Sequence, residues 1–172
     1  MNTGQTLITI GAIALLSIVI LRINTGFLST NSVLQETKTS VFAISYATST
    51  IEKANSLAFD SATDTTSLTN VNQLTDVFSL GPEAGETEDT FDDFDDYNNF
   101  VSKENFDMNG YYETRCYVSY IEPTNPDVSV NYRTWHKKIV VEVTSSALIS
   151  DWNTMEQDTI RLTSIFSYWF FR

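Results

Sequence analysis

The first 21 residues of the chain contain no charged side chain, and this stretch limits what the N-terminal part can fold into. From Gln5 to Leu21 the sequence is QTLITIGAIALLSIVIL, in which ten of 17 residues are Ile, Leu or Val. On the membrane-insertion scale those ten side chains contribute about −3 to −6 kcal/mol at the bilayer centre. As a helix the run is about 25 Å long, at the lower limit for crossing a bilayer. It predicts a helix that lies in a membrane or in an equally apolar assembly.

A secretory signal peptide is the alternative explanation of this run. Such a peptide begins with basic residues and ends in a cleavage site of small residues. The start of this chain has no Lys or Arg, and residues 23–26, INTG, match an Ala-x-Ala site poorly. We therefore expect the run to stay attached to the rest of the chain.

The helical pattern continues beyond the apolar run. Small and aliphatic residues recur mostly at steps of three and four, which marks one apolar face. The members of this face are Val33, Leu34, Val41, Ile44, Ala47, Ile51, Ala54, Leu57 and Ala58. Since no proline occurs before Pro82, the simplest prediction is one helix from about Gln5 to Ala58, about 80 Å long. Gly26 is where we expect a bend or a melted turn. The C-terminal half of this helix can pack on a head domain, whereas the N-terminal half needs partners.

A short motif precedes the apolar run. Gly4 is followed by Gln5 and by the sequence Thr6-Leu7-Ile8. This arrangement resembles the processing site and stem of type IV pilin-like proteins, in which a peptidase cuts after the glycine and the stems polymerise. The resemblance implies cleavage between Gly4 and Gln5, and it places Thr9 where major pilins carry a glutamate. The stem residues that it implicates in assembly are Leu7, Ile8, Thr9, Ile10, Ile13, Leu16 and Ile20.

The acidity of the chain is concentrated in one segment. The 172 residues hold 10 Lys and Arg against 22 Asp and Glu, a formal charge of −12, and residues 61–110 alone carry −11 of it. This balance argues against nucleic acid as a partner, because phosphate binding needs clustered Lys and Arg. Aromatic residues recur every three positions within the segment, at Phe91, Phe94, Tyr97 and Phe100. We expect them to dock the loop on the head or on a neighbouring subunit.

The same loop offers carboxylates to a cation. Its string FDDFDDYN, residues 91–98, resembles a Phe-Asp-Asp-x-Asp-Asp-Tyr loop of some minor pilin-like proteins. Calcium prefers oxygen ligands, and the candidates are Asp92, Asp93, Asp95 and Asp96. An EF-hand that starts at Asp93 fails, because the required glycine is Asn98. An irregular calcium site and a solvated acidic loop remain as alternatives. The solvated loop is favoured because charge runs usually face water.

From Tyr111 onward the hydrophobic period changes from 3.6 to 2, which predicts strands. Three antiparallel strands are expected, over residues 111–122, 136–146 and 158–172, with a turn at 123–127. The inward residues of the first two are Cys116, Val118, Tyr120, Ile139, Val141 and Val143. Residues 146–157, which include Trp152, are expected to form a long connection or a helical turn.

The predicted fold class is therefore α+β, a long N-terminal hydrophobic helix followed by a C-terminal antiparallel β head, as in a pilin. The expected parts are a stem at 1–58, an acidic connecting loop at 59–110 and a head at 111–172.

Individual side chains of the head support a structural interpretation. Cys116, the single cysteine, is expected to be a small buried hydrophobe. His136, the single histidine, is expected to be an exposed strand residue. The C-terminal sequence YWFF, residues 168–171, puts aromatic rings on both faces of a terminal strand. These rings either contact another subunit or complete the core of the head.

These features predict a structural subunit of an extracellular type IV pilin-like filament, with adhesion, motility and DNA uptake as the roles that the resemblance implies. The expected partners are other copies of the chain, and the cytoplasmic membrane before assembly; no nucleic acid, small-molecule substrate or cofactor is expected. The alternative is a membrane-anchored pseudopilin or a single-pass surface binding protein of a secretion or adhesion system. An enzyme is the least favoured class, because the sequence shows no nucleophile–base pair, phosphate-binding glycine loop or metal-ligand spacing.

Overall fold

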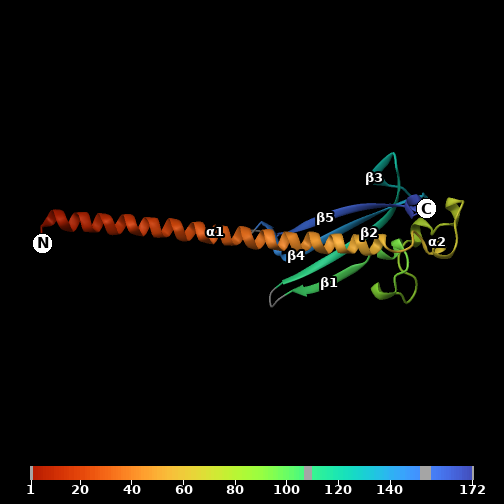
Figure 1. The fold of residues 1–172 in the computed structure, drawn as a ribbon, viewed down its shortest axis with the longest axis horizontal. Coiled ribbons are helices and arrows are strands. Elements are labelled where there is room, and N and C mark those ends of the chain that lie inside the picture. The colour runs from red at the N-terminus through yellow and green to blue at the C-terminus, as the bar shows by residue number, and fades with distance from the viewer. Residues whose placement is uncertain (1, 107–109, 152–155, 172) are drawn as a thin grey trace. The chain divides into compact units, whose positions relative to one another are not determined.

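The computed structural model of the chain describes residues 2–106, 110–151 and 156–171. The chain divides into two compact units, Met1–Lys38 and Thr39–Arg172. The first unit is helical, and the second joins the end of the same helix to a five-stranded antiparallel sheet (Figure 1). The predicted α+β class is confirmed.

The helix α1 spans Thr3–Asn55, close to the predicted range. The prediction of a melted turn at Gly26 is wrong, because the helix continues through this residue. A glycine inside a helix costs only about 1 kcal/mol relative to alanine, which the surrounding helical residues offset. The hydroxyl of Thr30 also donates back to the carbonyl of Gly26 at 3.0 Å, as helical geometry allows.

Residues 39–55 of α1 pack on the sheet through small side chains. Ala43, Ala47 and Ala54 are fully buried, and short side chains let a helix backbone approach a sheet closely. Tyr46 lies against Tyr112 of the neighbouring strand, with ring centroids 5.4 Å apart. The alanine stripe therefore sets how this part of α1 meets the sheet.

The predicted apolar face of α1 is only partly buried. Ala47 and Ala54 are buried as expected, whereas Val41 and Ile44 are exposed. The buried stripe passes through Ala43 instead, four residues before Ala47 and so on the same face of the helix. Aliphatic residues of α1 thus remain uncovered within the second unit.

The sheet has the strand order β1-β2-β4-β5, and β3 pairs with the end of β2. The strands are β1 Val101–Phe106, β2 Gly110–Glu122, β3 Asn125–Ser129, β4 His136–Asp151 and β5 Glu156–Ser167. In the central register, Val141 of β4 lies opposite Cys116 of β2 and Leu162 of β5. The three predicted strands correspond to β2, β4 and β5.

The strands β1 and β3 are absent from the sequence prediction for physical reasons. β1, with the sequence VSKENF, lies at the sheet edge and shows no alternation of apolar and polar residues. β3 begins with Asn125 and Pro126, which predict a turn. It pairs with β2 only at Asn125 and Ser129, and an edge position tolerates the proline.

The inward face of the sheet is the predicted one. On β2 the buried side chains alternate with the exposed Arg115 and Tyr117. All predicted inward residues of β2 and β4 are buried: Cys116, Val118, Tyr120, Ile139, Val141 and Val143. The alternation is confirmed because one face of this antiparallel sheet covers the core and the other meets water.

The C-terminal end differs from the prediction. β5 ends at Ser167, and Tyr168–Phe171 form a 3₁₀ turn rather than the end of a strand. Tyr168 stacks on Trp135 with centroids 4.8 Å apart, and its hydroxyl accepts the backbone N–H of Leu68 at 2.8 Å. Tyr168 thereby completes the head, as one of the two alternatives predicts.

Two further expectations for the head are wrong. The long connection predicted over residues 146–157 is replaced by strand, since β4 continues to Asp151 and β5 begins at Glu156; Trp152 lies outside the described residues. His136 is half-buried rather than exposed, because its Nδ1 lies 2.7 Å from the hydroxyl of Ser167 on the paired strand.

Short turns connect α1 to the sheet. They are α2 Ser61–Thr65 and 3₁₀ turns at Val71–Gln73, Val77–Ser79, Glu88–Thr90 and Phe94–Tyr97. Aspartates begin several of these turns; for example, Asp93 Oδ1 accepts the N–H groups of Asp95 and Asp96 at 2.8 and 3.2 Å. Such caps satisfy the backbone donors that a turn leaves unpaired.

The single cysteine gives a test of the buried face. Cys116 is fully buried, and burial raises the pKa of its thiol to about 12. Because the thiolate is the reactive form, iodoacetamide should label the native chain at pH 8 at least ~10³-fold more slowly than the chain in denaturant. Mass spectrometry of timed samples measures both rates. The variant Cys116→Ser/Tyr117→Cys moves the thiol to the exposed face and should react at the denatured rate. Fast labelling of native Cys116 would contradict the strand register.

Candidate functional site

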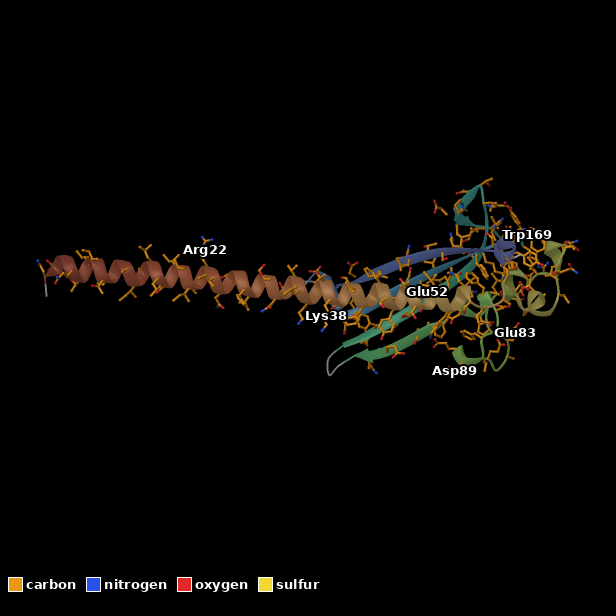
Figure 2. The ribbon with its side chains drawn as sticks, in the orientation of Figure 1. Arg22, Lys38, Glu52, Glu83, Asp89 and Trp169 are labelled. Carbon is orange, nitrogen blue, oxygen red and sulfur yellow. The ribbon has the colours of Figure 1, made fainter. Side chains whose placement is uncertain are left out.

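The helix of the first unit presents an apolar surface to solvent. Large aliphatic side chains project from residues 2–38 on all sides (Figure 2). Leu7, Ile8 and Phe27 are 70, 75 and 71% exposed, and Arg22 is the only charged residue between Asn2 and Gln35. A helix that is apolar all round is stable in a membrane or among other helices rather than in water. Residues 5–35 are named the stem surface below.

Among the described residues, α1 is the one helix long and apolar enough to cross a membrane. Polar residues within the stem surface use their hydroxyl groups in hydrogen bonds inside the helix. Three of them donate to the carbonyl four residues earlier: Thr9 to Gln5 at 2.7 Å, Ser17 to Ile13 at 2.9 Å and Thr25 to Leu21 at 2.8 Å. A hydroxyl satisfied in this way enters an apolar environment without losing a hydrogen bond. The stem surface is therefore more apolar than its composition indicates.

The residues predicted to take part in assembly all lie on this surface. Their exposed fractions are 70% for Leu7, 75% for Ile8, 64% for Ile10, 59% for Ile13 and Leu16, and 56% for Ile20. Gly4 and Gln5, the predicted processing pair, are exposed in the first turn of α1. Thr9 is exposed as well, and its hydroxyl is already hydrogen-bonded within the helix.

The second candidate region is the acidic turn, residues 91–97. It docks on the head through aromatic side chains, as predicted. Phe94 is fully buried, with its ring centroid 5.1 Å from that of Phe166 on β5. Phe91, Tyr97 and Phe100 pack edge to face with one another, at centroid distances between 5.2 and 5.7 Å. The head of the same chain thus supplies the docking surface.

A buried lysine holds the acidic turn from the inside. Lys137 of β4 has no exposed surface. Its ammonium group donates to the carbonyl of Phe59 at 2.7 Å, to Asp60 Oδ2 at 2.9 Å and to Asp95 Oδ1. Three acceptors match the three N–H groups of an ammonium ion. Because a buried charge is costly unless it is paired and fully hydrogen-bonded, this arrangement fixes Asp60 and Asp95 around one point.

Asp93 lies near this lysine and holds a proton, so it adds little negative charge there. Burial, together with the neighbouring charge of Asp95, raises the pKa of Asp93 to about 8. Asp93 therefore keeps its proton at neutral pH. The ammonium of Lys137 then faces the two carboxylates that it contacts, and the third acidic group adds no further charge.

The prediction of a solvated acidic loop is wrong for three of its four aspartates. Asp93, Asp95 and Asp96 are 1, 2 and 1% exposed, whereas Asp92 is exposed. For Asp95 the reason is the buried positive charge of Lys137, which the sequence interpretation left out. Asp93 and Asp96 instead accept backbone N–H groups of the turn itself. A signal for the buried lysine exists in the sequence, since Lys137 stands two residues before the inward Ile139 and so falls on the same face of the strand.

The four candidate calcium ligands do not gather at one point. Among the described residues, Asp96 alone of the four belongs to a carboxylate cluster, which it forms with Glu83 and Glu86. Neither glutamate was a candidate from the sequence, because both lie outside the 91–98 string. In the sequence, the spacing of three residues between Glu83 and Glu86 was the only indication that they lie together.

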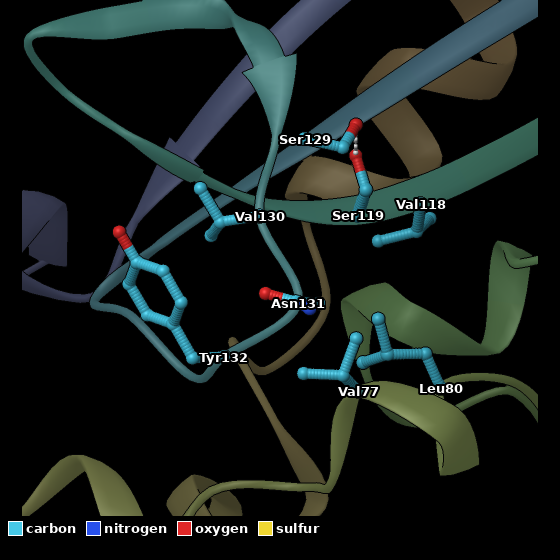
Figure 3. A pocket seen from close by; sticks show the side chains of 8 residues that line it. All are labelled: Val77, Leu80, Val118, Ser119, Ser129, Val130, Asn131 and Tyr132. Carbon is cyan, nitrogen blue, oxygen red and sulfur yellow. Dashed lines mark hydrogen bonds between the residues drawn. The ribbon is translucent and has the colours of Figure 1, made fainter.

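An open hollow of about 540 Å³ lies beside β2 (Figure 3). It is lined by Val77, Leu80, Val118, Ser119, Ser129, Val130, Asn131 and Tyr132. The hydroxyls of Ser119 and Ser129 lie 2.8 Å apart and bond to each other. These eight lining residues include no Asp, Glu, His, Lys, Arg or Cys.

Comparison of the chain with protein-family models, with curated proteins and with solved structures finds no match. The long apolar N-terminal helix and the antiparallel sheet are compatible with a pilin-like layout. What the chain does is therefore inferred from its own residues.

Of the regions described, the stem surface most strongly requires a partner. The charges of the acidic turn around Lys137 are met within the head, and the hollow is lined by no Asp, Glu, His, Lys, Arg or Cys. The stem surface, in contrast, exposes ten large aliphatic side chains between Gln5 and Leu21. Exposed apolar area of this extent marks a membrane or protein interaction site.

Proposed function

We propose that the chain is a structural subunit of an extracellular filament and polymerises with other copies of itself through the stem surface. The observation that carries the proposal is the exposed, uncharged apolar run from Gln5 to Leu21, joined to a folded head. Before assembly the cytoplasmic membrane holds the same surface. Both environments remove the aliphatic side chains from water, which is the favourable part of the process.

Transfer of the stem from lipid to filament needs a further source of stability. Lipid tails are as apolar as leucine, so helices associate in this setting through close packing. Gly11, Ala12 and Ala14 lie in the middle of the run, and a Cβ added at Gly11 would meet nothing within 4 Å. Small residues among large ones provide the holes into which aliphatic side chains of neighbouring stems fit.

The proposal is tested on cells that produce the chain. Material sheared from the cell surface is viewed by electron microscopy, and the subunit mass is measured. We expect filaments that contain the chain, with Gln5 as its first residue. Full retention of the chain in the membrane after shearing, without filaments, would contradict the proposal and support a membrane-anchored surface protein. A first residue near Thr25 would instead show that the run is a signal peptide.

A further inference from the structure

Three carboxylates meet where the turn at residues 81–86 approaches the acidic turn. Glu83, Glu86 and Asp96 each place one carboxylate oxygen within 4.8 Å of the other two. In the described part of the chain, the ion pairs formed by Lys and Arg go to other carboxylates. The protein thus gathers three acids without placing a described basic side chain among them.

Asp96 is the member of this cluster that indicates a ligand. It is 1% exposed. Its Oδ2 accepts the backbone N–H groups of Asp92 and Asp93 at 2.9 and 3.1 Å, whereas its Oδ1 is buried and has no hydrogen-bond partner. A buried polar atom without a partner is strongly unfavourable and rare in native proteins. One oxygen of this carboxylate lies within 4.8 Å of carboxylate oxygens of Glu83 and Glu86, so a cation held by the three side chains would lie beside the unpartnered atom.

The turn that carries the two glutamates brings them together against their repulsion. The N–H of Glu83 donates to Glu86 Oε2 at 2.8 Å, and the N–H of Glu86 donates to the carbonyl of Glu83 at 3.1 Å. Gly85 has φ 99°, a conformation that favours glycine and closes the turn. A hydrogen bond with the side chain of Glu86, with burial, raises the pKa of Glu83 to about 7.

We propose that Glu83, Glu86 and Asp96 bind one calcium ion. All three ligands are carboxylate oxygens, whereas zinc prefers nitrogen and sulfur. Asp96 is fixed and buried, while Glu83 is exposed and Glu86 half-buried. Water reaches the open side and completes the six to eight ligands that calcium accepts in irregular geometry; magnesium demands a near-ideal octahedron. This site is independent of polymerisation, so its test and that of the filament proposal can fail separately.

The bound ion would give the unpartnered Oδ1 of Asp96 a partner and join the 81–86 turn to the acidic turn. To test this, the full chain in non-ionic detergent is stripped with a chelator and titrated with calcium chloride by calorimetry. We expect one saturable site with a Kd on the order of 10⁻³ M or tighter. At a tenfold excess over Kd, calcium should raise Tm by about 4 °C. No binding and no shift would overturn the site, and equal binding of magnesium would overturn its assignment to calcium.

Matched variants separate a defined site from general attraction to an acidic surface. Glu83→Gln and Glu86→Gln should each weaken calcium binding by at least about tenfold. Asp89→Asn removes the same charge from an exposed position of the same segment and should leave the Kd within about twofold. Asp96→Asn removes the buried charge, so it should raise Tm in the absence of calcium and abolish the calcium response. Equal weakening by Asp89→Asn and Glu86→Gln would overturn the proposal.

Discussion

Replacing Lys137 with methionine should lower the free energy of unfolding of the head by about 3–5 kcal/mol. Methionine has a similar length, so the packing against Phe59 and Tyr120 is largely kept. The loss comes from the charges, because Asp60 and Asp95 stay buried without their common cation. Chemical denaturation of the full chain in detergent, followed by tryptophan fluorescence and by labelling of the buried cysteine, measures the change.

The matched control is Lys53→Met. Lys53 forms an exposed ion pair with Glu88 at 2.9 Å, and exposed pairs contribute at most about 1 kcal/mol. Adding Asp60→Asn and Asp95→Asn to Lys137→Met should recover much of the lost stability, because no uncompensated charge then remains. If Lys137→Met and Lys53→Met had equal effects, the buried lysine would not be what holds the acidic turn.

Replacing Ile13 with aspartate should remove the chain from membranes and prevent filament formation. On the insertion scale this change costs about 3–4 kcal/mol at the centre of a membrane helix, as much as the whole run contributes. Partition into the bilayer should therefore fall by at least about 100-fold. Flotation of the chain with lipid vesicles measures membrane binding, and electron microscopy of sheared cell-surface material measures assembly.

Asn31→Asp is the control for Ile13→Asp. It adds the same charge to an exposed position of the same helix, ten residues beyond the run. Vesicle binding should stay within about threefold of the native chain, since the centre of the membrane helix is unchanged. Both variants should keep the head folded, which protection of Cys116 from iodoacetamide reports. Normal vesicle binding by Ile13→Asp would show that the run is not what holds the chain in the membrane.

The helix and the inward face of the sheet are predictable from the sequence because each follows one period. The stem shows the composition of a membrane helix, and Cys116 to Tyr120 alternate as a half-buried strand does. The C-terminal turn is different. Aromatic residues at 168–171 fit either face of a strand, and the stacking of Tyr168 on Trp135 decides their conformation.

The acidic segment shows where local pattern fails. A run of aspartates predicts a solvated loop, and only a lysine 42 residues from Asp95 changes that outcome. The carboxylate cluster likewise joins Asp96 to Glu83 and Glu86, across a turn closed by Gly85. Contacts between distant residues determine both features. Strand periodicity places Lys137 on the inward face, but it does not report which carboxylates the lysine meets. The aromatic residues between 91 and 100 led to the correct prediction for this segment, namely that the loop docks on the head.

Site-specific photocrosslinking tests whether the stem surface is a contact between copies of the chain. A photoreactive leucine analogue at Leu16, in the middle of the stem, is activated in cells that produce the chain. We expect a ladder of crosslinked multimers, in steps of the mass of one subunit, in the material sheared from the cell surface. Adducts with lipid alone, and no crosslinks between copies, would contradict it.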